Sequence, residues 1–393
     1  MGITKLSDLI RNEAPSAISY KEISDYTGKA VAVDASIVLQ QFRTAIPRLH
    51  NRNGVNLSPL TGLFFRTLSF LEHDIKPVFI FDGRPPEQKK RVLEKRAQAA
   101  GWSGSYCSSS VSTQNQDCKS LLQHLGVPYV QAPGDAEAYC AQLVKDGKVD
   151  AVASEDMDTM AFGSDLLIRQ LNAKKNSEVM EYSLPKVLAA LQLTYREFVD
   201  LCILLGCDYC QKIQGLGPKK ALKLIQKHKT IEAVVLHINR ETHPVPQEWR
   251  YREARELFFQ VPHGSPPALV WKEPDEQELV KFLCREKHVK EERVRRRMEN
   301  FRQTLRERRR EREETSKAEK SKQTCIKDFF RVTRKREPFR GGLAGVFWII
   351  VLLQNQSSFQ LEVTNRWPDI LLQDFLVDSR IHGSIYHSKS SRS

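Results

Sequence analysis

The chain reads Ala30-Val31-Ala32-Val33-Asp34 near its beginning, a short apolar run that ends in an aspartate. Val78-Phe79-Ile80-Phe81-Asp82 repeats this pattern. Ala151-Val152-Ala153 and Leu166-Leu167-Ile168 are two further short apolar runs. Runs of this kind, without polar alternation, are typical of parallel strands that are buried on both faces of a sheet. The four runs therefore predict the inner strands of a parallel sheet.

Helical patterns separate these runs, at residues 60–71, 117–125 and 136–144. From 184 to 229 the pattern becomes wholly helical, with one interruption at Gly215-Leu216-Gly217-Pro218. Strands that alternate with helices indicate a sheet wrapped by helices. We therefore predict an α/β fold with a central, mostly parallel sheet flanked by helices, followed by a helical region.

Length and composition exclude several classes of protein. The chain has 393 residues, of which 40% are hydrophobic and 28% charged, as expected for two or three globular units and not for collagen, global disorder or a membrane bundle. The longest apolar run, 341–353, is shorter than the roughly 20 residues that a spanning helix needs. The eight cysteines are scattered and nothing near Met1 resembles a signal peptide, so we expect a reduced intracellular setting without a membrane.

The positive charge of the chain is unevenly distributed. The formal net charge is +13, and residues 285–340 hold 22 Lys/Arg against 11 Asp/Glu. A basic excess of this size indicates a polyanionic partner such as nucleic acid. Most of the excess belongs to this arm, which we expect to begin as a charged helix or solvated arm and to become a linker around 313–322.

Acidic residues recur where the expected strands end. Asp34 and Asp82 end their runs, and Asp156 and Asp158 follow the third run. In an open α/β sheet, ligand sites form outside the carboxyl ends of the strands. Asp135 and Glu137 would open a helix, and Asp208 follows an apolar helix. We expect all of these side chains to meet in one cleft.

Acids in one cleft would repel one another unless cations neutralise them. Oxygen-only ligands suit Mg²⁺ or Mn²⁺. Two such ions about 4 Å apart can activate water and stabilise the leaving oxygen of a phosphodiester. The alternative for any single acid is a turn former or a helix cap, for Asp135 and Glu137 a favourable first-turn charge, and for Glu155 a solvated or structural role. The metal hypothesis therefore rests on the repetition at strand ends.

Several motifs, taken in order, resemble the flap endonucleases of the structure-specific 5′ nuclease superfamily. The resemblance covers roughly residues 1–98 and 117–336. The matching segments are Met1-Gly2-Ile3, Val31-Ala32-Val33-Asp34-Ala35-Ser36, Phe81-Asp82-Gly83-Arg84-Pro85-Pro86, Ala132-Pro133-Gly134-Asp135-Ala136-Glu137-Ala138, Ser154-Glu155-Asp156-Met157-Asp158, Leu204-Leu205-Gly206-Cys207-Asp208-Tyr209 and Gly215-Leu216-Gly217-Pro218-Lys219-Lys220.

The resemblance implies a PIN-like 5′ nuclease core and a helix–two-turn–helix region near 205–229. It implies an Mg²⁺-dependent endonuclease that cuts 5′ flaps, with 5′→3′ exonuclease activity as an additional expectation, in Okazaki fragment processing and base excision repair. It assigns two Mg²⁺ ions, for which Mn²⁺ can substitute, to Asp34, Asp82, Asp135, Glu137, Asp156, Asp158 and Asp208. Expected DNA substrates carry flaps, nicks or gaps, and the expected state is a monomer.

The resemblance also implies contacts to DNA. Gly215 and Gly217 would let the backbone approach a phosphate, Lys219 and Lys220 would bind backbone phosphates, and loop carbonyls would hold K⁺. Most turns of this kind merely reverse the chain, so the motif alone is a weak signal. Lys89 and Arg96, seven residues apart on one helix face, are expected to draw the scissile phosphate towards the metals, with Arg66 assisting. The alternative for these basic residues is a solvated helix face.

Two features depart from the family. The family has a longer helical arch where this chain has a Ser-rich stretch at 101–116, which we expect to be a short loop. We expect this departure to affect threading and selection of a free 5′ end more than hydrolysis. Gln40 stands where the family commonly has a tyrosine that stacks on a base beside the scissile bond. We expect weaker catalysis or looser choice of the cleavage site, because base stacking contributes about 1–3 kcal/mol.

The C-terminal arm contains a peptide pattern at 323–330 that resembles the segment that docks onto the sliding clamp, proliferating cell nuclear antigen. The residues expected to dock are Gln323, Ile326, Phe329 and Phe330. Such short patterns also arise by chance, but this one lies in a charged arm. The cluster at 334–336 favours import into the nucleus, with a solvated basic cluster as the alternative; the family resemblance adds nucleolus and mitochondrion. Residues 341–393 match no regular pattern, and we expect them to be a disordered tail.

The expected organisation therefore has five parts: an N-terminal nuclease region at 1–98, a shortened arch at 99–116, an internal nuclease region at 117–284, the basic arm at 285–340 and the atypical tail at 341–393. Two other hypotheses stay open within the superfamily: a 5′→3′ exonuclease and a junction-cutting relative. From a different class, the chain could be a catalytically weak factor that binds the clamp and DNA. The presence of all the acids argues against that hypothesis.

Overall fold

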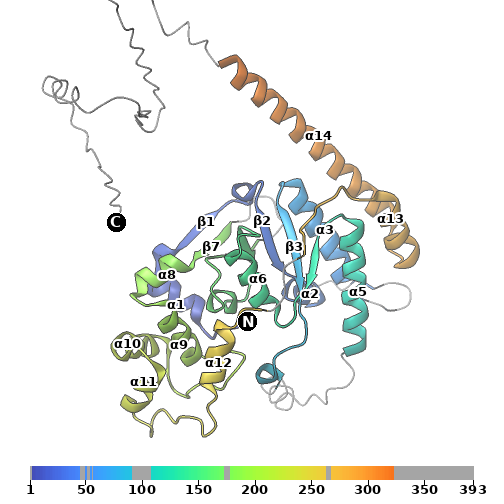
Figure 1. Cartoon of the computed structure of the whole chain (residues 1–393). Coiled ribbons are helices and arrows are strands. Elements are labelled where there is room, and N and C mark those ends of the chain that lie inside the picture. The colour runs from blue at the N-terminus through green and yellow to red at the C-terminus, as the bar shows by residue number, and fades with distance from the viewer. Residues whose placement is uncertain are drawn as a thin grey trace, which may run out of the picture. The chain divides into compact units, whose positions relative to one another are not determined.

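A computed structural model describes residues 2–44, 49–50, 54, 56–90, 108–171, 178–262 and 267–322. These residues belong to one compact unit, Met1–Gln323. Its centre is a seven-stranded sheet with the order β1-β7-β6-β5-β2-β3-β4 (Figure 1). The strands are β1 (Ile18–Lys21), β2 (Ala30–Asp34), β3 (Lys76–Phe81), β4 (Tyr129–Gln131), β5 (Ala151–Ala153), β6 (Leu166–Arg169) and β7 (Val179–Ser183).

The inner strands are parallel, as the apolar runs predict. β2 pairs in parallel with β3 on one side and β5 on the other, while β3–β4 and β5–β6 extend the parallel part outward. The two strands at one edge, β7 and β1, are antiparallel. The prediction of a mostly parallel sheet is confirmed, and the carboxyl ends of β2, β3 and β5 lie along the same edge of the sheet.

Alternation of side chains along β2 and β3 divides the apolar core into two layers. Val31 and Phe79 pack in one cluster with α2 (Ala35–Thr44), α3 (Ser58–Glu72) and α5 (Ser108–His124). Ala32 and Val78 point to the other face, which is covered by α1 (Leu6–Glu13), α6 (Ala136–Lys145), α8 (Leu184–Leu191) and α9 (Tyr195–Leu205). Helices therefore cover both faces of the sheet, as expected for an α/β fold.

The helical region gathers at one end of the sheet (Figure 1). After α9 the chain continues through α10 (Pro218–His228), α11 (Ile231–His237) and α12 (Tyr251–Phe259), while the short α7 (Asp158–Ala161) lies between β5 and β6. The loop 206–217 joins α9 to α10, at the place where the resemblance implies the helix–two-turn–helix. None of the described helices is long and apolar enough to span a membrane.

The prediction of a loop at 101–116 is wrong for residues 108–116, because α5 begins at Ser108. Residues 91–107, including Arg96, lie outside the described residues. Ser, Gln and Asn are only mildly unfavourable in helices, so tertiary contacts decide. Arg43 on α2 donates hydrogen bonds to the side chains of Gln114 (2.7 Å) and Asn115 (3.1 Å), and these bonds hold the polar half of α5 against the core.

The arm predicted to begin at residue 285 belongs instead to the compact unit as far as residue 322, the last that the structure describes. After α13 (Glu276–Val280) and a π-helical turn (Lys281–Glu286), α14 runs from Glu291 to Lys322, so the linker expected at 313–322 is also wrong. Val294, Met298 and Phe301 recur at helical spacing and are buried in the core. The charged helix expected at the start of the arm is confirmed. Its packing against the core was missed because charges surround these three residues in the sequence. The clamp-like peptide 323–330 and the tail 341–393 lie outside the described residues.

Candidate active site

The carboxylates converge at the carboxyl edge of the sheet, as expected from the strand ends. Asp34 closes β2, Asp82 follows β3, and Asp156 and Asp158 follow β5. Asp34, Asp156 and Asp158 are each less than 5% exposed, whereas Asp82 is exposed. Parallel neighbours in the sheet bring their carboxyl ends together, which explains why residues more than 100 positions apart share one site.

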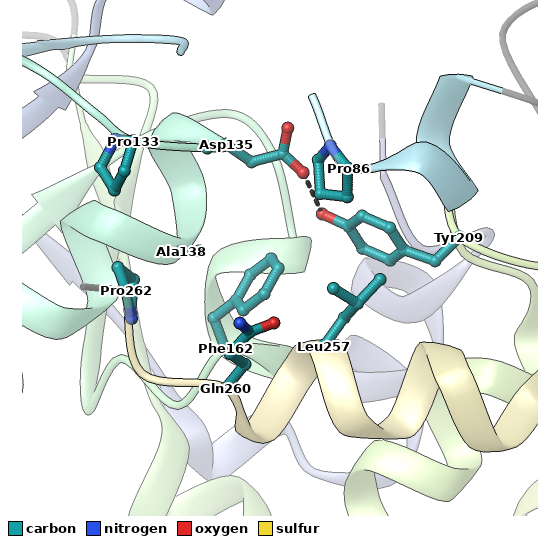
Figure 2. A pocket seen from close by; sticks show the side chains of 10 residues that line it. Pro86, Pro133, Asp135, Ala138, Phe162, Tyr209, Leu257, Gln260 and Pro262 are labelled. Carbon is teal, nitrogen blue, oxygen red and sulfur yellow. Dashed lines mark hydrogen bonds between the residues drawn. The ribbon is translucent and has the colours of Figure 1, made fainter. Parts of the chain in front are cut away.

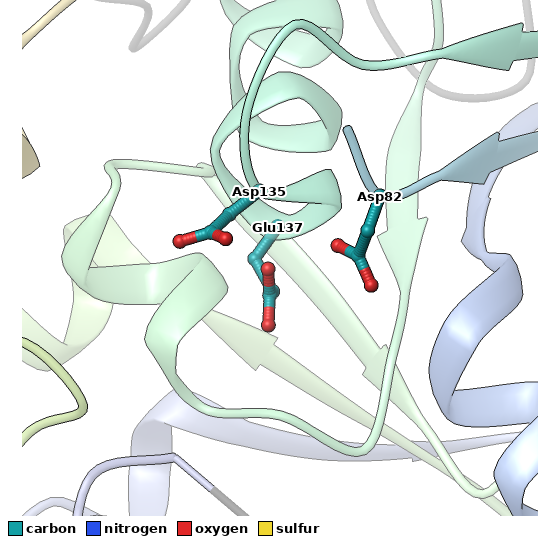
Figure 3. Close-up of side chains that lie close together, drawn as sticks. All are labelled: Asp82, Asp135 and Glu137. Atoms are coloured by element: carbon teal, nitrogen blue, oxygen red, sulfur yellow. The ribbon is translucent and has the colours of Figure 1, made fainter. Parts of the chain in front are cut away.

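One group of carboxylates comprises Asp82, Asp135 and Glu137. An oxygen of each lies within 4.8 Å of the other two, close enough for one ion to contact all three. Asp135 and Glu137 stand at the start of α6, opposite Asp82 after β3 (Figure 3). The amide of Ala136 donates to Oδ1 of Asp82 across 2.9 Å, and this bond ties the start of α6 to the end of β3.

A second group is built around Asp156 and Asp158. The amide of Asp156 donates to Ser154 Oγ and the amide of Asp158 donates to Asp156 Oδ1, each across 3.0 Å, so a tight turn after β5 presents both carboxylates. Burial raises the pKa of both groups, and the charge of Asp208 in the loop after α9 raises each further. Asp208 therefore acts on this group through its charge.

Asp34 couples the two groups. Burial, with the charges of Asp82 from the first group and Asp156 from the second, raises the pKa of Asp34 to about 7. Burial and the charge of Asp34 likewise raise the pKa of Glu137 well above its ordinary value. The negative charges of these carboxylates repel one another. A cation that neutralises them would therefore bind favourably.

Two buried oxygens supply independent evidence that the site fits a cation. Glu137 Oε2 and Asp158 Oδ1, one from each group, have no hydrogen-bond partner among the described residues. Buried polar atoms are nearly always paired, and an unpaired one calls for an ion or a water. The acids therefore form a site that could hold divalent metal, with an open ligand atom in each group.

Lys89 reaches into the first group of acids from the segment that follows Pro86. Its Nζ lies 3.2 Å from Asp135 Oδ1 and 3.7 Å from Glu137 Oε1, and its side chain is 15% exposed. Burial alone would lower the pKa of Lys89, but the charges of Glu137 and Asp135 outweigh burial and hold this pKa above its ordinary value. The structure thus brings a permanent positive charge to the place where the sequence predicts one.

Arg66 lies at the edge of the site, against a small hollow that Ser154 and Glu155 also line. Its guanidinium stacks over Phe42 at 4.5 Å and donates to Gln41 Oε1 at 3.1 Å. Burial lowers its pKa to about 10. Its role in DNA binding stays a prediction. Glu155 accepts from the amide of Gln170 and pairs with Arg169 at 3.3 Å, in agreement with the structural alternative for Glu155.

The basic residues of the α10 region are presented on the surface. Gly215 adopts a left-handed backbone, φ 72°, in the turn before α10, and Gly217 is the N-cap of this helix. Lys219 is exposed and lies 3.5 Å from Glu13 Oε1, while Lys220 Nζ lies 2.6 Å from His243 Nε2. The geometry leaves the N-terminal turn of α10 accessible, and the contacts of these residues to DNA stay predictions.

Two residues of the site had no role in the sequence-based prediction, although both lie in quoted motifs. Gly2 has φ 76°, and a Cβ at this position would overlap Oδ1 of Asp156 and Oδ1 of Asp158. Tyr209 donates from its phenol to Asp135 Oδ2 across 2.7 Å. The available signal for these roles was the place of each residue in its motif, Gly2 before Ile3 and Tyr209 after Asp208. The contacts themselves depend on how the chain packs.

Two family models match the segments of this chain that carry the acids. The XPG N-terminal domain matches residues 1–101 and the XPG I-region matches residues 126–208. These segments contain all of the converging carboxylates. The fold and the site therefore define a nuclease of the XPG class, which hydrolyses phosphodiester bonds in DNA.

Known relatives narrow this class. The chain is 60% identical over 336 residues to the Danio rerio protein "Probable flap endonuclease 1 homolog", an alignment that covers 86% of this chain and 95% of the relative. It is 41% identical over 371 residues to Homo sapiens flap endonuclease 1, covering 86% and 94%. The chain belongs to the flap endonuclease family.

Solved structures agree with this assignment. Flap endonuclease-1 from Methanococcus jannaschii superposes with a TM-score of 0.61 at 27% identity, covering 74% of this chain and 97% of that one. The catalytic core of Rad2 in complex with DNA substrate superposes with a TM-score of 0.65 at 25% identity, covering 76% and 100%. Each superposition therefore covers about three quarters of this chain and nearly the whole of the solved structure.

Proposed function

We propose that this chain is a structure-specific 5′ flap endonuclease, with 5′→3′ exonuclease activity at nicks and gaps. The observation that carries the proposal is the convergence of two groups of carboxylates, coupled through Asp34, each with a buried oxygen that has no partner among the described residues. Membership of the flap endonuclease family supplies the substrate class. The corresponding cellular roles are Okazaki fragment processing and base excision repair.

The donor set indicates which ions the site would hold. All candidate ligands are oxygens, which suits Mg²⁺ with Mn²⁺ as a substitute. Asp82, Asp135 and Glu137 would hold one ion, Asp156, Asp158 and Asp208 a second, with Asp34 between them. When bound, the ions would supply an activated water and stabilise the leaving oxygen of the phosphodiester.

Residues of the chain itself would position the DNA. Lys89 is held by Asp135 and Glu137, so its ammonium is preorganised beside the place where phosphoryl charge develops. The exposed N-terminal turn of α10 offers backbone amides and Lys219 to a duplex phosphate. We further propose K⁺ at the 206–217 loop, clamp binding through 323–330, a monomeric state and a nuclear location.

The proposal is tested with 5′-labelled flap, nicked, gapped and blocked-end substrates, with and without Mg²⁺. We expect Mg²⁺-dependent cleavage at the flap junction. A preference for nicked or blocked ends would instead support the exonuclease or the junction-cutting alternative. Asp156→Ala is expected to abolish cleavage while flap binding persists. Cleavage by Asp156→Ala would refute the metal assignment, and inactivity of the parent chain would favour the weak clamp- and DNA-binding factor.

A further inference from the structure

A pocket of about 290 Å³ opens beside the first group of acids, between the start of α6 and α12. Its walls include Pro86, Phe162, Leu257 and the ring of Tyr209, and Asp135 forms part of its rim (Figure 2). Because Asp135 belongs both to the pocket and to the acids, an occupant of the pocket would lie next to the reacting phosphate.

The pocket is mostly apolar and has packed aromatic walls. The rings of Phe162 and Tyr209 meet edge to face with centroids 6.0 Å apart, and both pack against the fully buried Phe258. The phenol of Tyr209 is already bonded to Asp135. The walls therefore present ring and aliphatic surface, and the volume is below the 300–1,000 Å³ typical of pockets for drug-sized ligands. A single nucleobase matches this size and this chemistry.

A second hollow adjoins the pocket at the C-terminal end of α12. Gln260 lines both, and the other lining residues of the hollow include Arg196, Arg252 and Phe259. Arg196 is exposed and Phe259 is 41% exposed. The Arg252 side chain is 73% exposed and its ion pair is long, with its Nε 3.9 Å from Glu232 Oε1, so most of its guanidinium faces solvent. Arg255, which also lines the hollow, is engaged by Asp200, and Glu256 contributes one negative charge. The accessible positive charge thus comes from Arg196 and Arg252.

Proteins bind single-stranded nucleic acid with apolar or aromatic surface, which contacts the bases, and with neighbouring arginines, which contact the phosphates. We propose that the pocket and the hollow together bind the unpaired 5′ strand of the substrate: one nucleobase enters the pocket beside Asp135, and the phosphates that follow lie on Arg196 and Arg252. This inference rests on the proposed flap endonuclease function. Continuity with the acids favours substrate DNA over a protein as the occupant.

Two variants test the pocket and the hollow separately. Ala138→Leu places a larger side chain into the pocket from α6, since Ala138 lines it. The double variant Arg196→Ala/Arg252→Ala removes the charge of the hollow. The matched control is Lys281→Ala/Arg285→Ala, which removes two exposed positive charges from a separate hollow beside α13. The surface double variants test the inference even if Ala138→Leu fails to fold.

Affinity is measured by fluorescence anisotropy in EDTA, which prevents cleavage, for a nicked duplex and for the same duplex with 5′ flaps of increasing length. We expect the parent to bind longer flaps more tightly. Ala138→Leu should weaken flap binding about 10-fold, the order of one lost base stack, and leave nicked-duplex binding unchanged. Arg196→Ala/Arg252→Ala removes two phosphate contacts. The slope of log affinity against log salt concentration for the flap contribution should therefore become shallower by about 1.4. The control should match the parent.

A second readout places 2-aminopurine at the first unpaired nucleotide. Its emission should be quenched in the parent complex and recover in Ala138→Leu. If the parent cleaves flaps but both variants keep its flap-length dependence and quenching, binding of the 5′ strand by the pocket and the hollow is refuted. The proposed function then stands. If the parent shows no preference for flaps, the proposed function fails, and the inference fails with it.

Discussion

The phenol of Tyr209 donates a hydrogen bond to Oδ2 of Asp135 across 2.7 Å, from a ring packed between Phe162 and Phe258. Burial and the charges of Asp135 and Glu137 raise the pKa of Tyr209, so the phenol stays protonated and can only donate to the carboxylate. Lys89 contacts the other oxygen of Asp135. The carboxylate is therefore oriented from both sides before any ion binds, and Tyr209 acts as a positioning residue.

Tyr209→Phe removes this hydrogen bond and keeps the ring packing. Partners that orient a metal ligand typically contribute 10- to 100-fold in metal affinity or activity. We expect the Mg²⁺ concentration at half-maximal single-turnover cleavage to rise by about 10-fold, with much of the rate recovered at saturating Mg²⁺.

The matched control is Tyr26→Phe, which removes the 3.0 Å bond from Tyr26 to Glu181 at the far edge of the sheet. Both variants should lose about 1 kcal/mol of stability, the usual contribution of one hydrogen bond. Only Tyr209→Phe should shift the Mg²⁺ dependence. An equal Mg²⁺ dependence in the two variants would assign Tyr209 a purely structural role.

Gly2→Ala should abolish activity, because the added Cβ would overlap carboxylate oxygens of Asp156 and Asp158. Gly28→Ala is the matched control: Gly28 has nearly the same backbone conformation, φ 80° against φ 76°, and open space around its Cβ position. Both changes carry the strain of a left-handed L residue, about 1–2 kcal/mol. Mg²⁺ titration and flap cleavage distinguish them. Full activity of Gly2→Ala would show that the N-terminal segment does not shape the site.

The sequence predicts the inner strands of the sheet, because each of them is a short apolar run. β2, β3, β5 and β6 are apolar runs buried in the sheet, and the strand-end rule is enough to expect Asp34, Asp82 and Asp156 together. β1 is missed because it is a short edge strand, with Tyr20 60% exposed, and carries little apolar signal. Edge strands are held by pairing, here with β7, and pairing is not visible in a local pattern.

The division of the acids into two groups could not be predicted either. It depends on backbone bonds such as Ala136 to Asp82 and on the approach of Tyr209 to Asp135, which join segments more than 50 residues apart. α14 was misjudged for a related reason. Its three buried residues stand among charges, and Arg297 pairs with Glu72 on α3 in a contact that only the fold creates.

Phe301→Ala tests whether the first half of α14 is an integral part of the nuclease body. Phe301 is 4% exposed and packs in the same cluster as α3 and α5. Truncation of a buried phenylalanine typically costs about 3–5 kcal/mol. Leu305→Ala, one turn further along the helix and 40% exposed, is the control and should cost about 0.5 kcal/mol. Urea unfolding measures both, and equal costs would mean that α14 is a detachable arm.

Gln40→Tyr tests the departure from the family on the exposed face of α2. Gln40 is exposed on this helix, so a tyrosine ring can be added without disturbing the core. A base stacked on that ring would contribute about 1–3 kcal/mol. We expect roughly 10-fold faster cleavage and a narrower set of product lengths on a 5′-labelled flap. Gln41 also lies on α2 but accepts from Arg66, so it is unsuitable as a control. Unchanged rate and products in Gln40→Tyr would remove Gln40 from the determinants of cleavage.

A partly buried cluster of charges around Arg255 of α12 gives the stability a defined pH dependence. Arg255 donates to Asp200 at 2.6 Å and to Glu232 at 2.9 Å, joining α9, α11 and α12. The bonds from Arg255 lower the pKa of Glu232 from 4.5 to about 2, whereas burial outweighs Arg255 at Asp200 and raises that pKa. The contributions of these two carboxylates to the free energy of unfolding therefore change with pH in opposite directions.

Glu232→Gln isolates one of these responses. Because folding lowers the pKa of Glu232, its contribution to the free energy of unfolding is complete above pH 4.5 and is lost as the pH falls towards 2. The stability difference between the parent and Glu232→Gln should therefore be largest at pH 7 and shrink between pH 4.5 and 2. Urea unfolding at about pH 7, 4.5 and 3 measures it. Glu241→Gln, at an exposed position in the loop after α11, should match the parent at every pH. A parent–Glu232→Gln difference that is constant across this range would show that Arg255 does not hold Glu232 ionised in the folded protein.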